Sequence, residues 1–129
     1  MAVLSKTLTL GAALAMPLGA QTAQLVVSHF SGTIYSLEFD AEAGSLAIVD
    51  QTNEAGQRIP AWVSWDSASK TAYVSDESWF GANTGRFASY SLAEDGSLTV
   101  SGVTNTNGGD LASGLFGGED GTSFLAQSN

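Results

Sequence analysis

The strongest constraint on the fold of this chain is an internal repeat. Several segments match one another at nearly constant spacing and in the same order along the chain. The pairs are residues 32–39 with 85–92 at an offset of 53, Gly44-Ser45-Leu46 with Gly96-Ser97-Leu98 at 52, and residues 65–66 and 71–75 with 116–117 and 122–126 at 51. A fixed period of this length indicates one supersecondary unit that recurs along the chain.

One complete copy of the unit spans residues 60–104. Four segments within or at the edge of this span are rich in β-branched and aromatic residues or alternate at period two, which predicts four short strands. These segments are residues 59–66, 71–76, 86–92 and 98–104. Polar turns separate the first two strands and the last two, and Gly96 is expected at positive φ. The polar residues 51–58 and 104–110 are predicted to connect one unit to the next.

Four strands per period favour an all-β fold, built as a partial β-propeller, because blades of about 40 to 50 residues are usual in propellers. A plain antiparallel sandwich with similar hairpins is the alternative. The predicted blades cover roughly residues 24–56, 57–109 and 110–129, and no helix is expected after residue 20. Since propellers close with about four to eight blades, we expect an N-terminal fragment of a longer propeller, or a part that assembles with copies of itself.

Composition excludes several classes of function. The chain has 13 acidic and 4 basic residues, a net charge of −9, and the basic residues are scattered along the sequence. Nucleic-acid binding needs clustered cations, so it is excluded as a main role. There is no cysteine, which rules out thiol nucleophiles, zinc–thiolate sites and disulfides. No metal and no cofactor are expected.

Residues 1–20 have the pattern of a secretory signal peptide. Lys6 lies in a short n-region, residues 7–16 are apolar, and the segment ends on the small residue Ala20. The segment is too short for a comfortable transmembrane helix, although an uncleaved anchor is the alternative. We therefore expect a secreted protein whose folded part is residues 21–129, with no membrane association beyond the signal segment.

Few residues in the chain could carry catalysis. His29 is the only histidine and lies at a strand end beside serines and a threonine; it is the candidate general base, or else an ordinary polar residue. Asp76, Glu77 and Trp79 lie in the loop after a strand and are candidate ligand-binding residues, or else parts of a solvated loop. Trp62 and Trp65 are expected in the core.

The residues also carry a resemblance to a known family. Residues 25–37, 60–66 and 71–75 and the two Gly-Ser-Leu turns resemble the start of the fungal seven-bladed lactonase propellers, which include 6-phosphogluconolactonase-like proteins and 3-carboxy-cis,cis-muconate cyclases. The resemblance covers about residues 23–127. Its motifs belong to the blades, so it identifies the fold better than the reaction.

The resemblance implies a function for the complete protein. Members of the family are expected to bind a carboxylated or phosphorylated lactone, or its open acid, and to hydrolyse or form the lactone ring without a metal. Many carry an Ala-His-Tyr-like step where this chain has Ala126-Gln127-Ser128, so no general-base histidine carries over and this chain alone is expected to be inactive. The alternative is a non-catalytic, secreted binding module. Open blades would also favour self-association.

Overall fold

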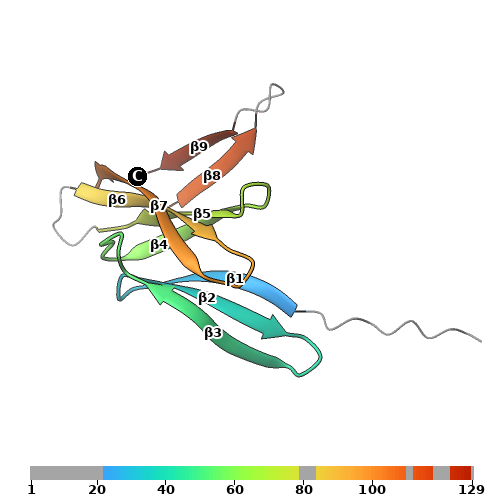
Figure 1. The fold of residues 1–129 in the computed structure, drawn as a ribbon. Helices are drawn as coiled ribbons and strands as arrows, with labels where there is room; N and C mark the ends of the chain where they lie inside the picture. The colour runs from blue at the N-terminus through green and yellow to red at the C-terminus, as the bar shows by residue number, and fades with distance from the viewer. Residues whose placement is uncertain (1–21, 79–83, 110–111, 118–122, 129) are drawn as a thin grey trace, which may run out of the picture.

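The computed structural model describes residues 22–78, 84–109, 112–117 and 123–128 (Figure 1). These residues form nine β-strands and no helix, as predicted. The strands are β1 (Thr22–His29), β2 (Thr33–Asp40), β3 (Ser45–Thr52), β4 (Pro60–Asp66), β5 (Thr71–Asp76), β6 (Thr84–Leu92), β7 (Leu98–Asn107), β8 (Ala112–Gly117) and β9 (Ser123–Ser128). None of the described segments is a helix long and apolar enough to cross a membrane.

The strands form three separate antiparallel sheets that follow one another along the chain (Figure 1). The first contains β1, β2 and β3, the second contains β4 to β7, and the third contains β8 and β9. In each sheet, strands that are consecutive in sequence pair with each other. The sheets lie close together at one edge, where β4 contacts both β1 and β8. This is the arrangement of successive propeller blades, with an open end on each side.

The second sheet is the predicted four-strand unit, with some strand ends that differ: β4 begins at Pro60 instead of residue 59, and β6 begins at Thr84 instead of Arg86. Its last strand was predicted to end at Thr104, but β7 continues to Asn107. The extension arises because residues 105–107 pair with Arg86, Gly85 and Thr84 at the start of β6. Strand pairing therefore overrides the polar composition that had indicated a connection.

The repeat is visible in the strand register. In the first sheet Leu25 pairs with Leu37 and Leu37 with Ile48, and the second sheet has the row Ala72, Tyr90 and Val100 in the corresponding places. A register shift lies between Ser36 and Leu37 in the first sheet and between Ser89 and Tyr90 in the second, 53 residues later. The turn glycines Gly44 and Gly96 both have positive φ, at 61° and 84°. The repeated sequence segments therefore have the same structure in the first and second sheets, including the position of the β-bulge.

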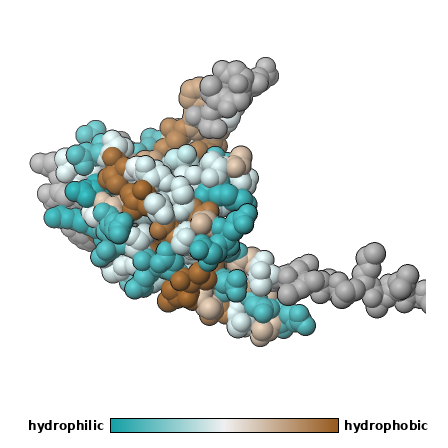
Figure 2. Space-filling model, viewed as in Figure 1, coloured by the Kyte–Doolittle hydropathy of each residue, from teal (hydrophilic) through white to brown (hydrophobic). Residues whose placement is uncertain are grey.

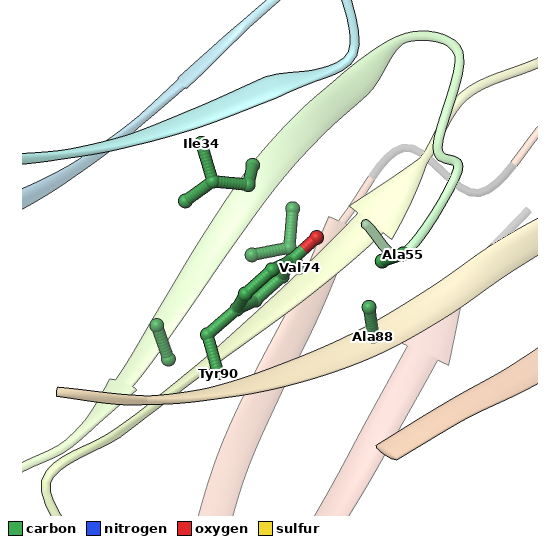
Figure 3. Packing of buried hydrophobic residues seen from close by; sticks show 6 residues of the cluster. Ile34, Ala55, Val74, Ala88 and Tyr90 are labelled. Carbon is green, nitrogen blue, oxygen red and sulfur yellow. The ribbon is translucent and has the colours of Figure 1, made fainter. Parts of the chain in front are cut away.

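The core lies between the first and second sheets (Figure 3). Ile34 of β2 and Ala55 of the connection between the sheets pack against Ala72, Val74, Ala88 and Tyr90 of the second sheet, and all six are buried. Small residues on β5 and β6 allow the sheets to approach closely, and the tyrosine ring fills the space between them. Hydrophobic burial at this contact is what holds the first two sheets together.

A buried polar network crosses the same contact. The Gln57 side chain donates from Nε2 to the carbonyl oxygens of Val74 (2.9 Å) and Arg86 (3.3 Å), and its Oε1 accepts from the Tyr90 hydroxyl (2.8 Å). At the outer edge the Leu98 amide donates to an Asp50 carboxylate oxygen at 2.8 Å. Buried polar groups must be paired, so these hydrogen bonds fix the position of the segment that connects the first sheet to the second.

The two tryptophans of β4 do not lie in the core, contrary to the expectation from sequence. Trp62 is 48% exposed and Trp65 is 41% exposed. β4 is an edge strand that pairs only with β5 in its sheet, so its large side chains extend past the layer that buries Ala72 and Val74. The apolar run of an edge strand looks like a core segment in the sequence, but residues of the neighbouring strands β5 and β6 fill the core.

We predict that ionisation of Tyr90 lowers the stability of the fold at alkaline pH. Burial, and secondarily the negative charge of Asp76, raises the pKa of Tyr90 to about 12 from a usual value of 10. Because the folded-state pKa lies above that of the unfolded chain, this contribution to stability is complete below pH 10 and is lost as the pH rises from 10 towards 12. Urea unfolding between pH 8 and about 11.5 should show this loss in the wild type and a smaller slope in Tyr90→Phe. Equal slopes would show that Tyr90 does not govern alkaline unfolding.

Candidate functional site

A polar pocket of about 480 Å³ lies at one end of the second sheet. β4 begins at this end, β5 ends there, β6 begins there and β7 ends there, so four chain segments contribute side chains. The lining residues are Gly56, Arg58, Asp76, Ser78, Thr84, Gly85, Arg86 and Asn105. The pocket thus combines two arginines and one aspartate with hydroxyl and amide side chains and two glycines.

Arg58 and Arg86 are the cations of this pocket. Both are exposed, and Arg86 donates from Nη1 to the carbonyl oxygen of Ala55 at 2.7 Å. That bond positions the guanidinium against the connection between the sheets and leaves the other N–H groups of the fork for a ligand. Two of the four basic residues of a chain with a net charge of −9 therefore line one pocket. A carboxylate or phosphate is the ligand group that two such forks bind best.

Asp76 has a structural position at the base of the pocket. Its side chain is 1% exposed, and its two carboxylate oxygens accept the backbone N–H groups of Arg58 (2.9 Å) and Ile59 (2.8 Å). Asp76 thereby holds the backbone of the segment that carries Arg58. The carboxylate predicted to bind a ligand lines the pocket, and in this structure it orients the arginine segment.

Glu77 and Ser78 also have structural roles beside the pocket. The Glu77 amide donates to the Ile59 carbonyl at 2.9 Å, and the Glu77 carbonyl accepts the Gly109 amide at 2.7 Å. Ser78 is buried and has a φ of 36°, an uncommon value for a residue with a side chain. These bonds tie together the segments around residues 59, 77 and 109. Trp79 lies outside the described residues.

His29, the candidate general base, is the last residue of β1, where it pairs with Thr33, and is exposed. Its Nδ1 accepts the backbone N–H of Ser31 at 3.1 Å and lies 2.9 Å from the Ser31 hydroxyl, and its ring meets Tyr35 edge-on at 6.4 Å. An Nδ1 that accepts an N–H bond places the proton of the neutral ring on Nε2. His29 could act as a base through Nε2 only after changing tautomer, at the cost of that bond.

The repeat places His29, Asp76 and Gln127 at equivalent positions on the three sheets: His29 and Asp76 are the last residues of β1 and β5, and Gln127 is the last but one of β9. His29 shares a sheet face with Leu25 and Val27, which is the face directed away from the second sheet, since the alternate residue Val26 packs on the core. The hydrogen bonds of His29 stay within its own turn, whereas those of Asp76 run to residues 58–59. The structure does not bring His29 into the Arg58–Arg86 pocket.

The sequence alone does not pair the two arginines, because charged residues 28 positions apart look scattered along the chain. The signal was in the strand order: the segment before a first strand and the start of a third strand lie at the same end of a four-strand unit. Among the described residues there is also no group of three acidic or histidine side chains arranged to hold a metal ion. Two arginines beside hydroxyl and amide side chains are an arrangement typical of anion-binding sites.

Comparison with known proteins gives one match. Residues 19–129 match the family model described as Lactonase, 7-bladed beta-propeller. No curated protein and no solved structure matches the chain. The family match covers all the described strands and agrees with three consecutive sheets that repeat one register.

Proposed function

The chain belongs to the Lactonase family of seven-bladed β-propellers, and from this premise we propose that its Arg58–Arg86 pocket binds a carboxylated or phosphorylated lactone or the corresponding open acid. The observation that supports this most is the meeting of two guanidinium groups in one polar pocket of an otherwise acidic chain. In such a pocket the arginines would hold the anionic group of the ligand by paired, charge-assisted hydrogen bonds.

The reaction we propose for the complete protein is hydrolysis or formation of a lactone ring, of the 6-phosphogluconolactonase or carboxy-cis,cis-muconate cyclase type. Hydrolysis adds water to the ring carbonyl and breaks the ring C–O bond, which requires a group that takes a proton from water and a group that gives one to the leaving oxygen. The arginines supply ligand binding and charge stabilisation for this chemistry. The part of the chain that the structure describes has no imidazole in their pocket.

A second candidate function is a non-catalytic binding module. Gln127 occupies the place where the resemblance implies a histidine, and both oxygens of the Asp76 carboxylate are occupied by backbone amides. An assay of the full chain with 6-phosphogluconolactone and with 3-carboxy-cis,cis-muconate separates the two. Turnover above the spontaneous rate supports the enzyme, and ligand binding without turnover supports the module.

Ligand binding is tested by calorimetry with 6-phosphogluconate as the probe. The chain is produced by secretion from a host cell, so that N-terminal sequencing of the protein in the medium also tests whether residues 1–20 are removed. We expect measurable binding that weakens as salt is added, and a loss of affinity of about tenfold or more in Arg58→Gln and in Arg86→Gln, since a charge-assisted bond contributes about 1.5 to 3 kcal/mol.

The control for this experiment is Lys70→Gln. Lys70 lies in the turn between β4 and β5, at the opposite end of the sheet, and its substitution changes the net charge by the same amount. If Lys70→Gln weakens binding as much as the arginine variants do, the attraction is a general charge effect and the pocket is not the site. Gluconate without the phosphate then shows which anionic group the arginines bind.

A further inference from the structure

The connection between β3 and β4 makes a turn beside the polar pocket. The turn spans residues 53–56 and is closed by a hydrogen bond from the Gly56 amide to the Asn53 carbonyl at 3.0 Å. Ala55 and Gln57, on either side of Gly56, are 1% and 5% exposed, so the turn is anchored in the core. Figure 2 shows mainly hydrophilic residues around the end of the second sheet at which β6 begins. Gly56 itself is exposed on this polar surface.

Arg86 of β6 is held against this turn by two hydrogen bonds. Its Nη1 donates to the Ala55 carbonyl at 2.7 Å, and its own carbonyl oxygen accepts from Gln57 Nε2 at 3.3 Å. The Gln57 side chain is held in turn by the Tyr90 hydroxyl, which donates to its Oε1 at 2.8 Å. One short segment therefore fixes both the guanidinium and the backbone of Arg86. A guanidinium held in this way loses little conformational entropy when it binds a ligand.

Gly56 leaves the room that this guanidinium occupies. Its φ is 64°, and a Cβ atom at this position would collide with Arg86 Nη1 and lie 3.4 Å from Arg86 Cζ. Nη1 is at the far end of a flexible side chain, so a larger residue at this position would move the guanidinium and leave the backbone in place. A side chain at residue 56 would therefore displace Arg86 without dismantling the sheets.

Arg58, the other cation of the pocket, is held differently. Its backbone amide donates to an Asp76 carboxylate oxygen at 2.9 Å, and its guanidinium makes no hydrogen bond to another of the described residues. The two cations thus differ in freedom, since a turn fixes one guanidinium and the other can adjust to a ligand. A prepositioned group determines where a ligand binds, because its ordering cost is already met by the fold.

We infer that Gly56 is a positioning residue: it allows the Arg86 guanidinium to lie on the Ala55 carbonyl, where it is the fixed anchor for the anionic group of the ligand. Arg58 contributes the second, adjustable guanidinium. The nature of the ligand rests on the proposed function, whereas the position of Arg86 does not. A lysine at residue 86 could not replace the arginine, because only a planar fork has donors for both the turn and an anion.

The test compares Gly56→Ala with Gly44→Ala in the full chain. Gly44 has a similar φ of 61° and nothing within 4 Å of its Cβ position, so its substitution brings the backbone strain alone. In ¹⁵N-labelled protein without ligand, the Arg86 Nε–Hε signal should shift in Gly56→Ala and stay in place in Gly44→Ala. The unfolding constants of the two variants in urea should agree within about tenfold, since Gly56→Ala adds only the loss of one hydrogen bond.

Calorimetry with 6-phosphogluconate measures the effect on binding. Gly56→Ala should bind about tenfold more weakly than the wild type, as Arg86→Gln does, and Gly44→Ala should bind like the wild type. The Gly56→Ala/Arg86→Gln double variant should be no weaker than Arg86→Gln, because Gly56 acts only through Arg86. If Gly56 had a merely structural role, the two losses of affinity would add.

An Arg86 signal that stays in place in Gly56→Ala overturns the inference, even if the wild type binds the probe. So do additive losses of affinity in the double variant. A Gly56→Ala chain that does not fold also overturns it, because the glycine would then serve the fold and not the arginine. A shifted Arg86 signal in a protein whose wild type binds no 6-phosphogluconate supports the positioning by Gly56 and counts against the proposed function.

Discussion

Gly32→Ala is expected to lower the free energy of unfolding by about 3 to 4 kcal/mol, close to the upper end of single-residue effects. Gly32 ends the turn between β1 and β2 with a φ of 84°, and a Cβ atom there would collide with the backbone oxygen of Gln57. The positive φ alone disfavours a side chain. The clash is with backbone, so relief would require the connection between the first two sheets to move and would disturb the Gln57 bonds to Val74 and Tyr90.

Two other glycines separate these causes in urea unfolding experiments. Gly44 has a φ of 61° and open space around its Cβ position, so Gly44→Ala measures the backbone cost alone, about 1 kcal/mol. Gly114 has neither a positive φ nor a neighbour within 4 Å, so Gly114→Ala should be nearly neutral. If Gly32→Ala lowers the free energy of unfolding no more than Gly44→Ala does, a Cβ atom at residue 32 does not clash with the Gln57 backbone as the structure indicates.

Asp76→Ala is expected to destabilise the fold by about 3 kcal/mol, because it removes a buried carboxylate and leaves two partly buried backbone N–H groups without acceptors. Those groups belong to Arg58 and Ile59, so the segment that carries Arg58 should also loosen, and any ligand affinity of the pocket should fall. Asp76→Asn keeps the shape and one acceptor oxygen and should cost about half as much. Denaturant unfolding of the three proteins at pH 7 gives these values.

The same variants have a second readout at high pH. The charge of Asp76 is the smaller of the two causes that raise the pKa of Tyr90, after burial. In Asp76→Asn the Tyr90 phenol should therefore ionise at a lower pH than in the wild type, though still above its usual value. An unchanged tyrosine titration together with unchanged stability would show that Asp76 does not occupy the buried position described here.

The repeat alone predicted the strand order, the four-strand unit and the positive φ at Gly96, because turn chemistry and period-two alternation are local properties of the sequence. It did not predict the β-bulge beside Leu37 and Tyr90, nor the extension of β7 to Asn107, which depend on pairing between strands. The exposure of Trp62 and Trp65 also escaped prediction. Their apolar run looks like a core strand, and only the sheet order shows that β4 lies at an edge.

The candidate site was predictable in part. Asp76 and Glu77 were placed in a loop after a strand, but Asp76 is the last residue of β5, and the sequence could not show that backbone amides occupy its carboxylate. The pairing of Arg58 with Arg86 depends on two segments 28 residues apart meeting at one end of a sheet. His29 was chosen by residue type, and the face on which it lies follows from packing between sheets.

The most direct test of the account is a nuclear magnetic resonance titration of the arginine side chains with 6-phosphogluconate. The ¹⁵N-labelled full chain has only two arginines, and the Arg58→Gln and Arg86→Gln variants assign their Nε–Hε signals. We predict that both signals shift together with one saturation curve, because both guanidinium groups would bind the same anion. Signals that stay in place while backbone amides elsewhere shift, or two arginine signals that saturate independently, would contradict a shared anion site in this pocket.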